Sequence, residues 1–132
     1  MRIVRSRKAI VTLACTVVAA AVLAGTALSG LISQTIVRDS TSVHLRVVRS
    51  VADAYDSGWH THPGPAIVQV QEGSFQITQG TCTPTTVSAG QTYVEVPFLA
   101  VRAVSTGRVV WTTTLVGPQE DALLTPTTSP CG

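Results

Sequence analysis

Apolar and polar residues alternate with a period of two in several segments after residue 43. In residues 66–71, apolar side chains at positions 66, 68 and 70 alternate with Gln69 and Gln71. Because successive side chains of a strand point to opposite faces, this pattern predicts a strand with one buried face. Runs rich in β-branched residues predict further strands at 43–51, 75–78, 92–96, 99–104 and 109–116.

Glycine and proline residues separate these segments. They occur in Pro63-Gly64-Pro65 and at Gly73, Gly80, Gly90 and Gly107. Short strands separated by turn residues are typical of an all-β sandwich or barrel. No sustained 3.6-residue period, the sign of an amphipathic helix, follows residue 33. We therefore predict one β domain over residues 43–116. Residues 117–132 contain three prolines and are expected to form an irregular tail.

The N-terminal region has a different pattern. Residues 1–8 hold four basic residues and no acid, and the 24 residues from 9 to 32 carry no charge. A basic segment followed by an apolar run is typical of an export signal, and this run is long enough to cross a bilayer as a helix. A cleaved signal peptide and a retained membrane anchor both remain open. Either one makes the protein secreted or membrane-anchored with its domain outside the cytoplasm, and residues 33–42 are expected to be a linker or the lead into a first strand.

Charge and cysteine content refine this picture. From residue 31 onward the sequence contains five arginines and seven acidic residues, so this part has a net charge of −2 although the whole chain has +2. A nucleic-acid-binding domain needs a basic patch on its folded part, so nucleic acid is not an expected partner. Cys82 and Cys131 predict a disulfide in an oxidising compartment, with two free thiols as the alternative. The bond would tie the tail to the domain and contribute on the order of 4 kcal/mol.

The strongest candidate for chemistry is the stretch Gly-Trp-His-Thr-His-Pro-Gly-Pro at residues 58–65. His60 and His62 are two positions apart, so on a strand both imidazoles point to the same face. Two histidines at this spacing are a common element of metal sites. The same pair also occurs on ordinary protein surfaces.

This stretch resembles the first motif of the cupin family, G-x5-H-x-H-x3,4-E-x6-G. His60, His62 and Gly73 match it, whereas Ala66 stands at the glutamate position and Ala54 at the opening glycine. The second motif, G-x5-P-x-G-x2-H-x3-N, matches at Gly90. Its proline, second glycine, histidine and asparagine are replaced by Val96, Phe98, Val101 and Ser105. The stretch is also similar to small exported actinobacterial cupins with a Gly-Trp-His-x-His-Pro-Gly-Pro signature. The resemblance covers residues 43–116 and implies a cupin-type antiparallel β-barrel or jelly roll.

The resemblance implies an incomplete metal site. Cupin centres usually take three histidines and one glutamate, and the apolar Ala66 and Val101 occupy two of these positions. Glu95 precedes the second-motif strand and could reach the barrel mouth. Glu72 is expected to be solvated and His44 to lie on a surface strand. With His60 and His62 alone, binding of a divalent transition metal is expected to be weak, and no other cofactor is implied.

Two classes of function remain open, with a purely structural envelope domain as a third. The first is a small-molecule binding module with His60 and His62 as polar anchors. Its apolar wall is expected to consist of Val68, Val70, Val101 and Ala103. Trp59 either covers the ligand or packs as a half-buried aromatic. The second is a metal-dependent enzyme, an oxygenase or isomerase, that uses the two histidines; the apolar residues at two ligand positions favour the first class.

The period of two also predicts which way the side chains face. Inward positions are Ala66, Val68, Val70, Val101 and Ala103, and outward positions are Gln69, Gln71 and Arg102.

Overall fold

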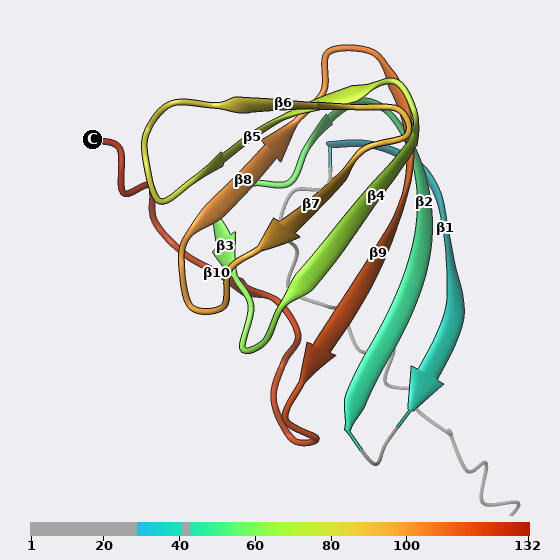
Figure 1. Ribbon diagram of the computed structural model, residues 1–132, viewed down its shortest axis with the longest axis vertical. Helices are drawn as coiled ribbons and strands as arrows, with labels where there is room; N and C mark the ends of the chain where they lie inside the picture. Colours follow the sequence, from blue (N-terminus) through green and yellow to red (C-terminus); the bar gives the residue numbers. More distant parts are fainter. Residues whose placement is uncertain (1–28, 41–42) are drawn as a thin grey trace, which may run out of the picture.

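The computed structural model describes residues 29–40 and 43–132, and these form ten strands and no helix (Figure 1). The strands are β1 Ser29–Ser40, β2 His44–Asp56, β3 His60–Thr61, β4 Ala66–Glu72, β5 Ser74–Gln79, β6 Thr85–Ser88, β7 Thr92–Glu95, β8 Val101–Val104, β9 Arg108–Gly117 and β10 Thr125–Pro126. Every pairing is antiparallel, and the sheet curls into a nearly closed barrel. The predicted all-β barrel is confirmed.

Two groups of strands form the walls of this barrel. One runs β1-β2-β9-β4-β7, and the other contains β10, β3, β8, β5 and β6. Their ladders join where the end of β2 meets β8, at the pair Asp56 and Val104. Arg102 of β8 also binds the Asp56 carboxylate, with 2.9 Å between Nε and Oδ1. The strands at the two ends of the order β10-β3-β8-β2-β9-β4-β7 are therefore β10 and β7.

Strand β1 differs from the linker expected over residues 33–42. It pairs with β2 from Ser29 to Ser40, so the strand overlaps the end of the expected signal or anchor (residues 1–32) and most of the expected linker. The β-branched residues Ile32, Ile36 and Val37 favour an extended backbone, and the long β2 offers an edge to pair with. The rest of the predicted signal or anchor, residues 1–28, lies outside the described residues. No helix in the described part of the chain is long and apolar enough to cross a membrane.

The predicted facing pattern is confirmed in β4 and β8. The five predicted inward residues are all buried, namely Ala66, Val68, Val70, Val101 and Ala103. Gln69 and Gln71 are exposed. The Arg102 side chain is 41% exposed and lies against Asp56 on the outside.

An aromatic cluster fills the interior. Phe75 packs against Tyr55 and Trp111, with ring centroids 5.8 and 5.0 Å away, and Tyr55 and Trp111 are 4.8 Å apart. The contacts are edge-on or tilted, as aromatic quadrupoles prefer. The three rings come from β2, β5 and β9, so they join strands from both walls.

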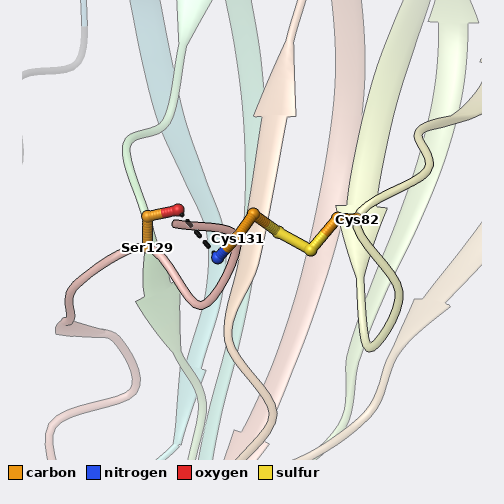
Figure 2. The surroundings of a disulfide bond; sticks show 3 residues. All are labelled: Cys82, Ser129 and Cys131. Atoms are coloured by element: carbon orange, nitrogen blue, oxygen red, sulfur yellow. Dashed lines mark hydrogen bonds between the residues drawn. A yellow bond between two sulfur atoms is a disulfide. The ribbon is translucent and has the colours of Figure 1, made fainter.

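The C-terminal tail returns across the barrel. Its two-residue strand β10 pairs with β3, so the tail expected to be irregular contributes one short strand. The Thr127 N–H donates to the Trp59 carbonyl at 3.0 Å. Beyond it, Cys131 forms a disulfide with Cys82 in the loop after β5, which confirms the predicted pair (Figure 2).

Candidate metal and ligand site

The loop that carries the two histidines is fixed by its glycine and proline residues. Gly58 has a φ of 65°, which favours glycine, and its N–H donates to Oδ1 of Asp56 at 2.9 Å. Gly64 packs directly on β9, because a Cβ there would lie 1.9 Å from the Val116 carbonyl oxygen. Pro63 lacks the N–H that a longer β3 would need. His60 therefore lies in the short strand β3, and His62 follows directly after it.

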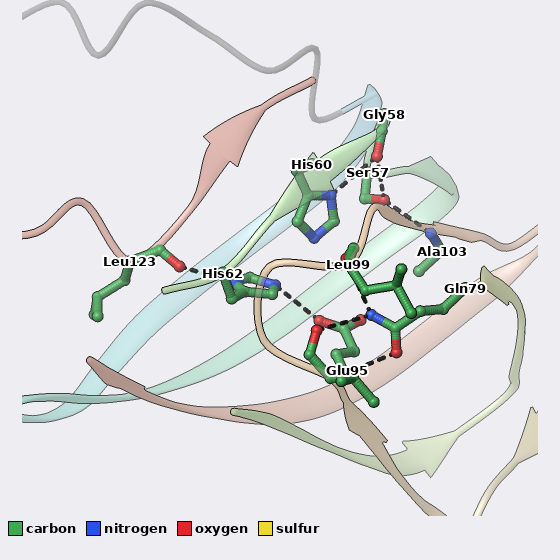
Figure 3. A network of polar contacts seen from close by, with 10 residues as sticks. Ser57, Gly58, His60, His62, Gln79, Glu95, Leu99, Ala103 and Leu123 are labelled. Carbon is green, nitrogen blue, oxygen red and sulfur yellow. Dashed lines mark hydrogen bonds and ion pairs between the residues drawn. The ribbon is translucent and has the colours of Figure 1, made fainter. Parts of the chain in front are cut away.

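His60 and His62 converge inside the barrel (Figure 3). Each is only 4% exposed, and their ring centroids lie 4.8 Å apart with an interplanar angle of 81°. The predicted convergence of the two imidazoles is therefore seen, although the rings are more deeply buried than a rim position implies.

Backbone carbonyls orient both rings. The Nδ1 of His60 lies 3.0 Å from the Gly58 oxygen, and the Nδ1 of His62 lies 2.6 Å from the Leu123 oxygen. A carbonyl only accepts hydrogen bonds, so Nδ1 carries the hydrogen in each neutral ring. This leaves the lone pair on Nε2 of both rings. Metal-binding histidines are oriented by second partners of the same kind.

Glu95 brings a carboxylate to these rings from strand β7. Its residue is 4% exposed, and Oε2 lies 2.8 Å from Nε2 of His62. At this ion-pair distance the carboxylate faces a ring nitrogen that has no other polar partner among the described residues. One ligand atom from each of His60, His62 and Glu95 lies within 4.8 Å of the others. The expected pair of ligands is thus corrected to a group of three.

Gln79 fixes the end of the strand that carries Glu95. Its Oε1 accepts from the Val96 N–H at 2.8 Å, and its Nε2 donates to the Val96 and Leu99 carbonyls at 3.2 Å each (Figure 3). The Phe98 N–H in turn donates to the His62 carbonyl at 2.9 Å. These bonds join the segment after β7 to β5 and to the histidine loop, so Glu95 and His62 are positioned together.

Burial and charge affect the two histidines differently. Burial lowers the pKa of His60, and the Gly58 carbonyl and the Glu95 charge offset only part of this effect. Burial also lowers the pKa of His62, but the Glu95 carboxylate and the Leu123 carbonyl outweigh it, so its net pKa is raised. In the metal-free protein, His62 therefore takes a proton first.

The three side chains fit a divalent transition metal. Two imidazole nitrogens and one carboxylate are donors typical of zinc, iron, nickel or copper sites rather than calcium or magnesium sites. A buried Nε2 lone pair facing a carboxylate is unfavourable unless a cation, either a proton or a metal, lies between them. The carboxylate also supplies the negative charge that two neutral imidazoles lack.

Comparisons with known proteins identify the architecture. No protein-family model matches the sequence, and no curated protein matches it significantly. A double-stranded β-helix protein from Klebsiella pneumoniae superposes with a TM-score of 0.60 and 19% identity, covering 76% of this chain and 82% of that one. A cupin superfamily protein from Desulfitobacterium hafniense gives a TM-score of 0.59 and 10% identity, covering 64% and 76%. An RmlC-like cupin from Methanocaldococcus jannaschii superposes with a TM-score of 0.57 and 9% identity, covering 66% of this chain and 80% of that one. The chain has the cupin fold.

The cupin barrel encloses a cavity of about 460 Å³ beside the three ligands. His60, His62 and Glu95 form part of its wall, together with the aromatic cluster. Val68 and Ala103 line it, as predicted for the apolar wall. The lining also includes Gln34, His44, Arg46, Leu115 and Leu124.

Three predicted ligand-binding residues do not line this cupin cavity. Val70 and Val101 are buried within the core cluster, and Val101 is the cross-strand partner of His60. Trp59 is half-buried and its carbonyl is bound by Thr127, which agrees with the packing alternative. By contrast, His44 lines the cavity instead of lying on the surface, and its Nδ1 is 3.1 Å from the Asp121 carbonyl oxygen. The Glu72 side chain is 61% exposed, as expected.

Proposed function

We propose that this cupin domain binds a small organic molecule in its barrel cavity, beside a divalent transition metal held by His60, His62 and Glu95. The observation that carries the proposal is the convergence of three ligand atoms within 4.8 Å on the wall of the cavity. Three protein ligands leave further coordination positions, which a donor atom of a small molecule can take.

The make-up of the cavity supports ligand binding. Its volume of about 460 Å³ lies in the range of small-molecule sites. Apolar and aromatic side chains form most of the lining, and a few polar groups converge on it, as in many binding pockets. Burial, with the nearby charges of Glu95 and Asp56, raises the pKa of Tyr55, so its hydroxyl stays protonated as a hydrogen-bond donor.

A metal-dependent enzyme, an oxygenase or isomerase, is the second candidate. The observation that favours it is the set of three ligands, since catalytic sites keep positions open whereas structural zinc sites are closed by four protein ligands. A metal held there would act as a Lewis acid on an oxygen of the bound molecule. Glu95 and the two histidines would hold it, and Leu123 and Gly58 would keep the rings oriented.

Metal analysis of the untagged protein, dialysed against metal-free buffer, tests the proposal. We expect near-stoichiometric metal in the wild type and its loss in His60→Ala and Glu95→Gln. Glu72→Gln is the matched control, because this carboxylate is exposed and far from the histidines in the ladder. Wild-type protein without metal, or metal kept in both site variants, would refute the site.

Mass spectrometry of molecules released on denaturation separates the binding module from the enzyme, because an enzyme converts the released molecule on incubation and a binding module does not.

We also propose that the domain works outside the cytoplasm. The Cys82–Cys131 disulfide supports this, because such bonds persist in oxidising compartments. The basic and apolar residues 1–32 would direct export, with cleavage or retention as the two alternatives. Fractionation of cells with an antibody to the domain tests the location, and the mass of the recovered chain distinguishes the alternatives.

A further inference from the structure

Arg46 has a buried donor that no described residue satisfies. Its Nη2 lies 3.1 Å from Oδ2 of Asp39, but its Nε is buried without a hydrogen-bond partner among the described residues. Leaving a buried donor of a charged group unpaired is costly, so such a group calls for an explanation. Arg46 lines the barrel cavity, on the same face of β2 as the buried Val48 and Ser50.

The sheet register places Arg46 in one row with the metal-site carboxylate. Arg46 pairs with Leu115 of β9, Leu115 with Ala66 of β4, and Ala66 with Glu95 of β7. Directly paired residues share a face, so all four lie on the inner wall. Arg46 and Glu95 are three strand spacings of about 4.8 Å apart, which is roughly 14 Å along the sheet. The straight distance between them is shorter because the sheet is curled. A single small molecule can therefore contact both ends.

The wall of the cavity is mainly apolar. The lining includes Val48, Leu115, Trp111 and Phe75, with Ser50 and Thr113 as polar members. Arg46 is the only lysine or arginine among the lining residues of the described chain. One guanidinium carries a single positive charge, which suits a monoanion, and its planar fork matches a carboxylate. The pair with Asp39 is weak enough to yield, since the two side chains are 35% and 43% exposed.

We propose that the ligand of this cavity is a small carboxylic acid with an apolar, ring-sized body. Its carboxylate binds Arg46, its body lies against the apolar wall, and its far end faces His60, His62 and Glu95. This inference rests on the proposed ligand-binding function and names the class of molecule bound.

Isothermal titration calorimetry with phenylacetate and its neutral isostere phenylacetamide tests this assignment. We expect the wild type to bind phenylacetate about tenfold or more tightly than phenylacetamide, as a charge-assisted hydrogen bond allows. Arg46→Gln should remove this preference and leave the affinity for phenylacetamide unchanged. Arg49→Gln, which removes the same charge from the exposed face of β2, should behave as the wild type. Thermal unfolding of each variant checks that the fold is kept.

Each outcome bears on the proposal. A wild type without carboxylate preference, binding of neither probe, or equal loss in Arg46→Gln and Arg49→Gln overturns it. Metal content measured on the same samples keeps the two proposals separate. Carboxylate preference without metal would refute the metal site and leave the Arg46 site standing, whereas stoichiometric metal without preference would do the reverse.

Discussion

Ala66 and Glu95 are direct cross-strand partners in the β4–β7 ladder. The cupin motif carries its glutamate at the position of Ala66, and here a carboxylate reaches the histidines from the neighbouring strand. Such partners have Cβ atoms only about 5 Å apart on one face of the sheet, so a side chain on either strand can reach the same point. The small methyl group of Ala66 leaves room for the Glu95 side chain.

This relationship predicts that the carboxylate can be moved back. Glu95→Ala should abolish stoichiometric metal binding, and Ala66→Glu in the Glu95→Ala background should restore it, because the new carboxylate starts on the same inner face. The measurement is metal content after dialysis, with circular dichroism to verify folding. Ile67→Glu in the same background is the control, since Ile67 points to the opposite face of β4. Restoration by Ile67→Glu, or no restoration by Ala66→Glu, would show that the two positions do not share the site.

The sequence predicted the strands and their facing, because alternation in β4 and β8 reflects burial of one face directly. For Glu95 it predicted only that the side chain could reach the barrel mouth, and it left the residue out of the expected ligands. Alternation in residues 92–96 assigns Val94 and Val96 to the interior, yet they are 53% and 52% exposed and Glu95 is 4% exposed. Such an inversion is typical of a functional site, but it shows only in the folded sheet, because an acid between two valines is an ordinary outward position in the sequence.

The pairing of strands from distant segments also could not be predicted from the sequence. β7 lies beside β4 only because of the register of the folded sheet, and Glu95 follows His60 and His62 by 35 and 33 residues in the chain. β1 and β10 illustrate the same limit. Their residues look like a linker and a tail, and they become strands because β2 and β3 offer edges to pair with.

The two histidines should titrate in a defined order in metal-free protein. His62 should protonate at higher pH than His60, because the Glu95 carboxylate and Leu123 carbonyl favour its charged form whereas burial dominates at His60. NMR titration of the ring C–H resonances measures both values. Glu95→Gln should lower the pKa of His62, and Glu72→Gln should leave it unchanged. Protonation of His60 before His62 would contradict the assigned electrostatics.

The same shifts predict opposite effects on stability. The pKa of His62 is raised in the folded state, so its contribution is complete below the unfolded value near 6.5 and is lost as the pH rises through the folded value. The pKa of His60 is lowered, so folding is opposed as the pH falls through the unfolded value. Urea unfolding of metal-free protein between pH 5 and 8 should therefore show His62→Ala losing most stability at low pH. His60→Ala should tolerate acid better than the wild type, and parallel pH profiles for the two variants would disprove this.

Two phenylalanines offer a test of the core. Phe75 is 1% exposed and contacts both Tyr55 and Trp111, whereas Phe98 is 77% exposed. Phe75→Ala should lower the free energy of unfolding by about 3–5 kcal/mol, since it removes a large buried ring and leaves a void. Phe98→Ala should change it by no more than about 0.5 kcal/mol. Denaturant unfolding of both variants measures the difference, and similar losses would mean that the aromatic cluster does not carry the core.

The disulfide should stabilise the metal site as well as the fold. Cys131 anchors the tail whose Leu123 carbonyl orients the His62 ring. Cys131→Ser should therefore lower the free energy of unfolding by about 2–5 kcal/mol, as is usual for native bonds in small exported domains. It should also weaken metal binding, by less than the roughly 10–100-fold loss that follows removal of an orienting partner, because β10 still holds the tail on β3. Denaturant unfolding and competition with a metal chelator measure the two effects.

Ser129→Ala is the control for the disulfide prediction, because it removes only the acceptor for the Cys131 N–H and keeps the Cys82–Cys131 bond (Figure 2). Unchanged stability in Cys131→Ser would refute the structural role of the disulfide. Unchanged metal affinity with lowered stability would show that β10 alone positions Leu123.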